Sequence, residues 1–320
     1  MYAKRIKSLL LEISQVYLTL LKVMVPAIVI VKILDLLGGT QWLAKVLAPL
    51  MKFVGLPEQL GLVWATAILT NIFTAMVVFV DVTVELGLSV AQVSVIGILI
   101  LISHSVPIEG AVAKMVGVSW RLTISLKIGG GLLLAGLVNW FYSTFDYQQQ
   151  AAVLLWQSER REQTLMQWGL DQLQMLLSIF FIISALIILL RVLKKMGVER
   201  LLQKSLSPIF KLIGITKDAS SITITGITLG LSYGAGLLIS EVKKGHISKK
   251  DVLLSISFLS LAHSLIEDTL LILLLGADVI AILWVRILFS IIVVALLARY
   301  ISIKELMQLK PLSVKNRNEE

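Results

Sequence analysis

The amino-acid sequence predicts an all-α polytopic membrane protein, and three observations support this fold class. Of the 320 residues, 57% are hydrophobic and 15% are charged, whereas about a quarter of the residues of a soluble domain are charged. Apolar stretches of about 20 residues, enough to cross a bilayer as a helix, recur along the chain. The chain also aligns with itself without a gap when it is shifted by 159 residues. These observations exclude a disordered chain and a water-soluble globule.

The internal repeat divides the chain into two similar halves. We expect a first repeat at 1–145, a polar linker at 146–164, a second repeat at 165–305 and a basic, polar tail at 306–320. Internal repeats of this kind are the usual build of secondary transporters. Polar and conformationally special residues mark the alignment, and the matched pairs are Pro49 with Pro208, Gly55 with Gly214, His104-Ser105 with His263-Ser264, Glu109 with Asp268, Gly117 with Gly276 and Lys127 with Arg286.

The charges of matching loops predict that the second repeat is inverted relative to the first. Residues 32–58 carry three Lys or Arg and their counterpart 191–217 carries seven, while residues 81–91 carry none and 240–250 carry four. Because basic loops stay in the cytoplasm, matching loops are expected on opposite sides of the membrane. The basic residues near the start of the chain place the N-terminus in the cytoplasm. We therefore expect a multi-pass protein of a bacterial inner membrane with both termini cytoplasmic.

Two apolar segments do not fit ordinary membrane spans, because of the charges of the loops that flank them. Residues 219–240 lie between two basic loops that both belong on the cytoplasmic side of the membrane. A re-entrant helical hairpin keeps both loops on that side, whereas a single span would place one of them outside. Its counterpart at 58–80 would turn at Leu69-Thr70-Asn71, because Ser, Thr, Asn and Gly suit backbone that leaves a helix at membrane depth. The alternative is a plain span in which Gly226, Gly230 and Gly234 form a packing face.

The remaining pattern completes the expected architecture of about six spans, two re-entrant hairpins and two interfacial amphipathic helices. The amphipathic segments, at about 43–54 and 199–213, precede the two hairpins and can lie along the membrane surface. The expected spans lie at about 16–37, 90–107, 121–143, 170–191, 251–275 and 280–299.

This order of elements, present twice, resembles the core of the concentrative nucleoside transporters. The sequence itself resembles the nucleoside recognition, or Gate, family, through Leu206-Ser207-Pro208-Ile209-Phe210, the Gly-rich segment 230–236 and the segment 263–268. That family includes spore maturation membrane proteins and the gate regions of the bacterial ferrous iron transporter. The resemblance implies the fold over nearly the whole chain. No Gly-x4-Gly-Lys-Ser/Thr pattern for GTP binding accompanies it, so a stand-alone iron pump of the ferrous-transporter type is not implied.

Ionisable residues at membrane depth are costly and by default mark a pathway or a pair. If a pseudo-two-fold axis relates the repeats, the two histidines could face one cavity, where imidazole and carboxylate can bind a divalent transition metal or relay protons. The structural alternative is that each histidine bonds a neighbouring helix and each carboxylate pairs with Lys127 or Arg286. The candidates for ion or proton coupling are His104, Glu109, His263, Glu267 and Asp268.

The hairpin tips supply the candidate substrate ligands, because interrupted helices expose free backbone N–H and C=O groups. The alternative is that the polar side chains of the tips only satisfy the broken backbone. The candidates are Thr70, Asn71 and Thr74 in the first half and Ser232 and Tyr233 in the second.

We expect a secondary transporter of a small solute, nucleoside-like or a cation, with its site at the hairpin tips. The alternative is a non-transporting membrane scaffold or regulatory subunit of a larger complex, with the basic loops as a surface for a partner or anionic lipid. We expect no enzyme activity and no cofactor, because the chain has no cysteine and no His-Glu-x-x-His motif. The expected partners are the lipid bilayer and the solute or ion, with a second copy or another membrane protein left open, and not nucleic acid.

Overall fold

The protein is an all-α polytopic membrane protein, as the sequence predicts. The computed structural model describes residues 2–83, 86–153, 164–229, 237–238, 240–241 and 247–300. Within these ranges the regular structure is helical, apart from one isolated bridge between Ser89 and Ala151. Five helices in the described part are long and apolar enough to cross a membrane, namely Leu9–Leu36, Val90–Met115, Trp120–Thr144, Leu165–Lys195 and Ile280–Arg299.

The first repeat consists of α1 (Tyr2–Leu36), α2 (Gly39–Phe53), α3 (Leu60–Leu69), α4 (Ile72–Thr83), α5 (Val90–Ser103), α6 (Val106–Met115), α7 (Trp120–Ile124), the π-helical turn η1 (Ser125–Gly129) and α8 (Gly130–Thr144). The second repeat contains α9 (Leu165–Lys195), α10 (Val198–Leu212), α11 (Lys217–Leu229), α13 (Lys249–Leu261), α14 (Glu267–Leu273), the π-helical turn η2 (Ile280–Val285) and α15 (Arg286–Tyr300).

The backbone repeats at the same offset of 159 residues as the sequence. Helices α2 and α10 match from end to end, and each follows a glycine with positive φ, 73° at Gly38 and 81° at Gly197. Helices α5 and α13 begin with matched capping boxes, in which Ser89 or Ser248 accepts a hydrogen bond from the third residue of the helix. The duplication therefore includes the local devices that start and end the helices.

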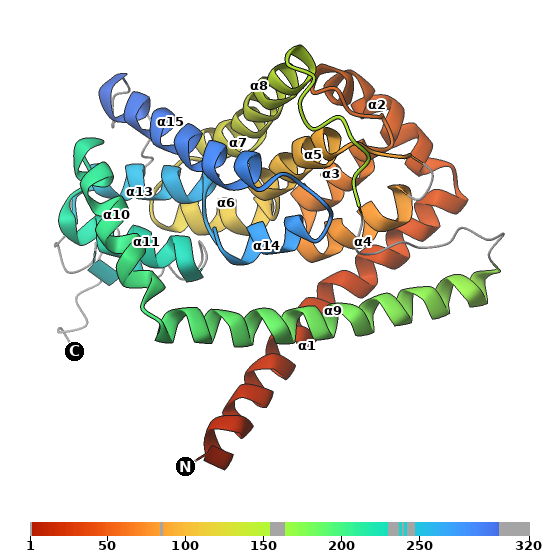
Figure 1. The fold of residues 1–320 in the computed structure, drawn as a ribbon, viewed down its shortest axis with the longest axis horizontal. Coiled ribbons are helices and arrows are strands. Elements are labelled where there is room, and N and C mark those ends of the chain that lie inside the picture. The colour runs from red at the N-terminus through yellow and green to blue at the C-terminus, as the bar shows by residue number, and fades with distance from the viewer. Residues whose placement is uncertain are drawn as a thin grey trace, which may run out of the picture.

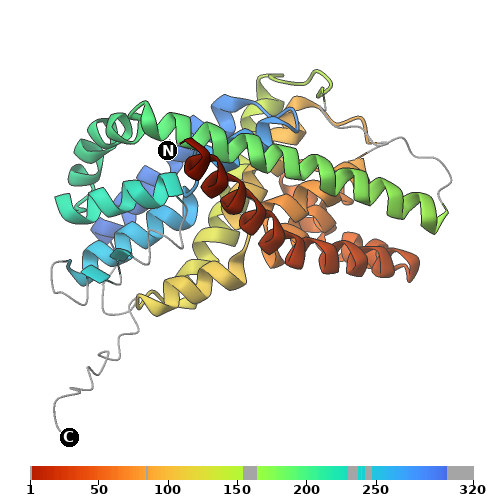
Figure 2. The ribbon, with the colours of Figure 1, turned by 90° about the horizontal axis from the view of Figure 1, so that it is seen from below.

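Two long helices, α1 and α9, cross along one side of the molecule (Figures 1 and 2). At the crossing the Tyr17 hydroxyl donates a hydrogen bond of 3.0 Å to the carbonyl oxygen of Leu176. These two residues are 159 positions apart, so equivalent positions of the two repeats touch, as they must on a two-fold axis. The most apolar windows of α1 and α9 are each 17% buried against 78% for that of α5–α6. The first helix of each repeat therefore lies outside, and α5 lies in the core.

Helices α3 and α4 form a helix pair that turns back on itself at the expected place. The break falls at Thr70, whose φ of −121° and ψ of −105° are not helical, and α4 starts two residues later. Glu58 and Gln59, before α3, line the same pocket as Asp81 and Val82 at the end of α4. Both outer ends of the pair thus lie at one face of the molecule. The second expected tip, Gly230-Leu231-Ser232-Tyr233-Gly234, lies outside the described residues and directly follows α11.

The expected spans at about 90–107 and 251–275 are each interrupted at the His-Ser pair, although Val90–Met115 as a whole is long and apolar enough to cross a membrane. Ser105 and Ser264 have positive φ values of 54° and 44°. The Ser105 N–H donates to the Ala67 carbonyl at 2.9 Å instead of to its own helix, and Leu265 N–H does the same to Ile227 at 3.0 Å. Each break is thus held by the C-terminal end of a neighbouring helix, α3 in the first half and α11 in the second. As a result, the fifth expected span, 251–275, consists of two short helices, α13 and α14.

Candidate functional site

The two helix breaks bring His104 and His263 into direct contact. Their Nε2 atoms are 3.1 Å apart and their ring centroids 4.9 Å apart. Both residues are buried, with exposed fractions of 6% and 4%. Because the two residues occupy equivalent positions, this contact is a second place, after the α1–α9 crossing, where the pseudo-two-fold axis passes through the molecule.

The other nitrogen of each imidazole faces the backbone of its own helix. His104 Nδ1 is 3.0 Å from the carbonyl oxygen of Ile100, and His263 Nδ1 is 2.8 Å from that of Leu259. A carbonyl oxygen can only accept, so the proton of each neutral ring sits on Nδ1. When both rings are neutral, both Nε2 atoms carry lone pairs and lie 3.1 Å apart.

Two carboxylates complete the buried cluster. Glu109 Oε1 is 3.3 Å from His263 Nε2 and 3.6 Å from His104 Nε2, and Asp268 Oδ2 is 3.8 Å from both nitrogens. Each carboxylate lies in the first turn of the helix that restarts after the break, α6 or α14. That position is favourable, because the start of a helix carries partial positive charge. One break therefore supplies both a histidine and a carboxylate.

The buried cations of the two halves, Lys127 and Arg286, differ in their partners. Lys127 Nζ donates to Glu109 Oε2 at 2.7 Å, and the lysine side chain is fully buried. Arg286 is also fully buried, but its one hydrogen bond in the described part of the chain is a long one, 3.5 Å from Nη2 to Thr269 Oγ1. Asp268 Oδ2 likewise has no hydrogen-bond partner among the described residues. The first half holds a closed ion pair, as the structural alternative predicts, whereas the second half is open.

Glu267 lies at the edge of this cluster and is half-buried. The sequence places Glu267 one helical turn after His263 on the same face of one helix. Because the helix breaks at Ser264, the two residues no longer share a helical face. No ion pair or hydrogen bond joins Glu267 to either histidine within the described ranges. Asp268 takes the position beside the histidines instead.

At the first hairpin tip, the polar side chains form hydrogen bonds with the interrupted backbone. Asn71 Oδ1 caps α4 by accepting from the Thr74 N–H at 2.9 Å and from its hydroxyl at 3.2 Å, while Thr70 Oγ1 donates to Thr66 O at 2.6 Å. The Ser105 hydroxyl donates to the Thr70 carbonyl at 2.7 Å. The tip is thus tied to the residue that follows His104. Asn71 Nδ2 makes no hydrogen bond with any described residue, which leaves one amide donor at the tip.

Ser232 and Tyr233 lie outside the described residues. The segment Gly230-Leu231-Ser232-Tyr233-Gly234 also spells Gly-x-Ser-x-Gly, the pattern of a hydrolase nucleophile elbow. That elbow joins a strand to a helix. Here the segment follows helix α11, so the structural context of the elbow is missing.

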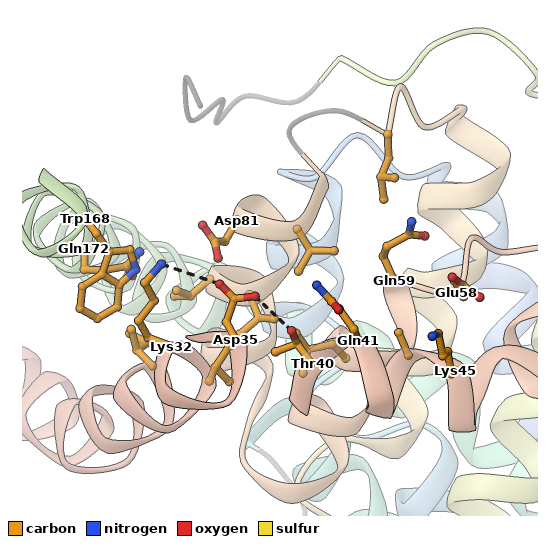
Figure 3. Close-up of a pocket in the computed structure, with 18 residues that line it drawn as sticks. Lys32, Asp35, Thr40, Gln41, Lys45, Glu58, Gln59, Asp81, Trp168 and Gln172 are labelled. Atoms are coloured by element: carbon orange, nitrogen blue, oxygen red, sulfur yellow. Dashed lines mark hydrogen bonds and ion pairs between the residues drawn. The ribbon is translucent and has the colours of Figure 1, made fainter. Parts of the chain in front are cut away.

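Sequence reasoning missed a polar pocket of about 440 Å³ at the outer ends of α3 and α4. Figure 3 shows that α1, α2 and α9 also contribute to its wall. Asp35 accepts a hydrogen bond of 3.0 Å from Thr40 and pairs with Lys32 at 3.8 Å, and Lys32 lies 5.7 Å from the ring centroid of Trp168. No local motif could have revealed it, because its residues come from distant segments. The remaining labelled side chains are Gln41, Lys45, Glu58, Gln59, Asp81 and Gln172.

The fold and the buried cluster define a helical membrane protein built from two similar halves, and comparison with known proteins agrees with this class. Residues 17–119, within the first repeat, match the family model described as Gate, nucleoside recognition, so the expected resemblance is confirmed there. An uncharacterized membrane protein of Bacillus subtilis (strain 168), YvoD, is 29% identical over 277 residues, which are 84% of this chain and 86% of that protein. No solved structure matches.

Proposed function

We propose that the protein is a secondary transporter of a small solute, with its central site where the Thr70–Asn71 tip meets the helix breaks at His104 and His263. The observation that carries the proposal is that both repeats contribute an interrupted helix to one buried polar cluster. Interrupted helices that meet at the interface of two repeats are how many secondary transporters build their substrate and ion sites.

The placement of the cluster in the bilayer supports this reading. On the loop charges, the helix pair α3–α4 is a re-entrant hairpin, the repeats are inverted, and both termini lie in the cytoplasm of a bacterial inner membrane. His104 and His263 then lie at membrane depth between long apolar helices. Ionisable groups there are costly and by default belong to a pathway or a pair. Glu109 already has its partner in Lys127, so the histidines are the groups left for function.

The pseudo-two-fold contacts suit alternating access. The α1–α9 crossing and the His104–His263 contact both lie on the axis, so rocking one repeat against the other would open the cluster to one side and close it to the other. The breaks at Ser105 and Ser264 are the natural hinges, since each holds a non-helical residue between two short helices. The free amide of Asn71 suits a hydrogen-bonding solute, and the histidine cluster suits a cation.

The matched pair of variants Asn71→Asp and Asn71→Ala tests the tip. Aspartate keeps the oxygen that caps α4 and removes the amide donor, whereas alanine removes both and costs about 1 kcal/mol of capping. Reconstituted protein is assayed for uptake of labelled nucleosides and of divalent cations. If the tip binds solute through this amide, Asn71→Asp lowers uptake about tenfold, the equivalent of one lost hydrogen bond of about 1.4 kcal/mol, and the melting temperature of each variant is measured alongside.

The scaffold alternative makes the opposite prediction. A scaffold tolerates Asn71→Asp, and no solute in the panel raises its melting temperature, although a ligand at 100 times its Kd stabilises by about 2.7 kcal/mol. Helix α10 would then be the docking surface, because Lys204 and Lys211 are exposed beside the exposed Leu201 and Leu212. Wild-type protein that takes up none of the panel and is stabilised by none of it contradicts the transporter proposal.

A further inference from the structure

We propose that His104, His263 and Asp268 bind a divalent transition-metal ion, with the two Nε2 atoms and Asp268 Oδ2 as its ligands. This inference names the cation for the central site. Its role in transport rests on the proposed function, but metal binding itself does not.

The imidazoles are already held as metal ligands are held. In metal sites, a coordinating histidine usually donates its second N–H to a carbonyl or carboxylate, which fixes the ring and leaves the other nitrogen free. The Ile100 and Leu259 carbonyls play that part here, at 3.0 and 2.8 Å from the two Nδ1 atoms. The same bond is made in both repeats, so both rings present an unprotonated Nε2 to one point.

Two lone pairs that face each other repel unless a positive species lies between them. The Nε2 atoms are 3.1 Å apart. Two nitrogens bound to one ion at about 2.1 Å lie roughly 3.0 Å apart at a right angle and about 3.4 Å apart at the tetrahedral angle. The observed separation falls inside this range, so the two histidines can coordinate one ion without moving.

Asp268 supplies the third ligand. Its Oδ2 atom is buried, has no hydrogen-bond partner among the described residues and lies 3.8 Å from each Nε2. The three ligand atoms all lie within 4.8 Å of one another, and a tetrahedral edge of about 3.4 Å requires Asp268 to move by only about half an ångström. Glu109 Oε1 lies nearer still, 3.6 Å from His104 Nε2 and 3.3 Å from His263 Nε2, but the charge of this carboxylate is already neutralised by Lys127, which is 2.7 Å from its other oxygen, Oε2. Three protein ligands leave a coordination position open for water or for a passing ligand.

The donor set selects a class of ion. Imidazole with carboxylate suits zinc, ferrous iron, manganese, cobalt and nickel. Magnesium and calcium prefer ligand sets made of oxygen alone. Cuprous copper prefers sulfur ligands, and the three ligand residues contain none.

The test measures metal bound by the full-length protein, purified in detergent with an affinity tag that contains no histidine and stripped with a chelator. Zn²⁺, Mn²⁺ and Mg²⁺ are titrated separately, and bound metal is counted by elemental analysis. We expect one Zn²⁺ or Mn²⁺ per chain and no stoichiometric Mg²⁺. Asp268→Asn and the double variant His104→Ala with His263→Ala should each weaken binding at least about tenfold, because ligand-shell changes cost that much or more.

Matched controls separate loss of ligands from loss of fold. Asp278→Asn removes another buried carboxylate, one that bonds Tyr142 at 2.8 Å instead of the histidines, and His246→Ala removes the third histidine of the chain. Both should leave the affinity unchanged. X-ray absorption of wild-type protein loaded with Zn²⁺ needs no variant, and it should show two imidazole nitrogens at about 2.0–2.1 Å.

Folded wild-type protein that binds neither Zn²⁺ nor Mn²⁺ overturns the inference and indicates that the two histidines share a proton instead. Stoichiometric metal that survives the double histidine variant also overturns it. The transport role fails separately. If the histidines bind metal but the protein takes up no solute in proteoliposomes, the metal site stands and the proposed transport function fails. If the protein takes up another solute but binds no metal, only the proposed metal site fails.

Discussion

At the residue scale, burial decides what each charged side chain does. Lys127 and Glu109 lie 2.7 Å apart and are both buried, so each is the other's neutralising partner. From the sequence, an ion pair between each carboxylate and a lysine or arginine was one of two alternatives, the other being an ion or proton pathway. It could not show that only the first half closes this pair, because the position of Arg286 depends on how α14 and η2 pack.

The first prediction concerns this pair. Removing one partner leaves an uncompensated buried charge and costs about 3–5 kcal/mol, whereas replacing both by neutral residues of similar size is often close to neutral. Glu109→Gln and Lys127→Met should therefore each lower the melting temperature of the detergent-purified protein strongly, and the double variant should recover much of the loss. A double variant as unstable as the sum of the singles would show that the two residues do not interact.

At the element scale, periodicity and turn chemistry predicted where helices exist, and tertiary contacts decided where they break. The turn at Thr70–Asn71 was predictable, because Thr and Asn have local reasons to leave a helix. The break after His104 had one local signal, Pro107, which stands in the first turn of α6 and favours a kink. Its exact place at Ser105 was not predictable, because it depends on the carbonyls of Ala67 and Thr70 at the end of α3, which are 35 residues or more away in sequence. The π-helical turns, η1, which contains Lys127, and η2, which ends directly before Arg286, were not predicted either.

The second prediction compares the two breaks. Ser105→Ala removes the hydroxyl that bonds the Thr70 carbonyl at 2.7 Å and keeps the positive φ of 54°, so it should destabilise the protein by about 1 kcal/mol. Ser264→Gly sits at a φ of 44°, where glycine is unstrained, so it should be neutral or slightly stabilising. Thermal melts of the two variants check the pair. If Ser264→Gly is the more damaging one, its hydroxyl holds the second break in a way that the described residues do not show.

At the scale of the whole molecule, duplication is what allowed the candidate site to be anticipated. Matching His104 to His263 in sequence led to the expectation that an axis relates the two histidines and that they face one cavity, and the structure brings their rings together. The distances to the carboxylates were out of reach, because they depend on the two breaks. The pocket at the ends of α3 and α4 was out of reach as well, since its wall combines α1 and α2 with α9 of the other repeat.

The last prediction tests whether the repeats are inverted in the membrane. The chain has no cysteine, so single cysteines can be introduced without further change at Glu58, Leu86, Lys204 and Lys249. Because the basic loops of the second repeat belong in the cytoplasm, a membrane-impermeant maleimide on intact cells should label the variants at Glu58 and Leu86. The variants at Lys204 and Lys249 should react only after permeabilisation.

Each pattern of labelling has one structural meaning. Glu58 and Leu86 flank α3–α4, so labelling of both from outside requires the helix pair to enter and leave the membrane on one face. If one of these two positions is labelled from outside and the other only from inside, α3–α4 crosses the membrane and is not a re-entrant hairpin. Labelling of all four from the same side would make the repeats parallel, and the axis through His104 and His263 would then stand along the membrane normal. A parallel arrangement would expose the histidine cluster symmetrically to one side only, and alternating access by rocking inverted halves would no longer apply.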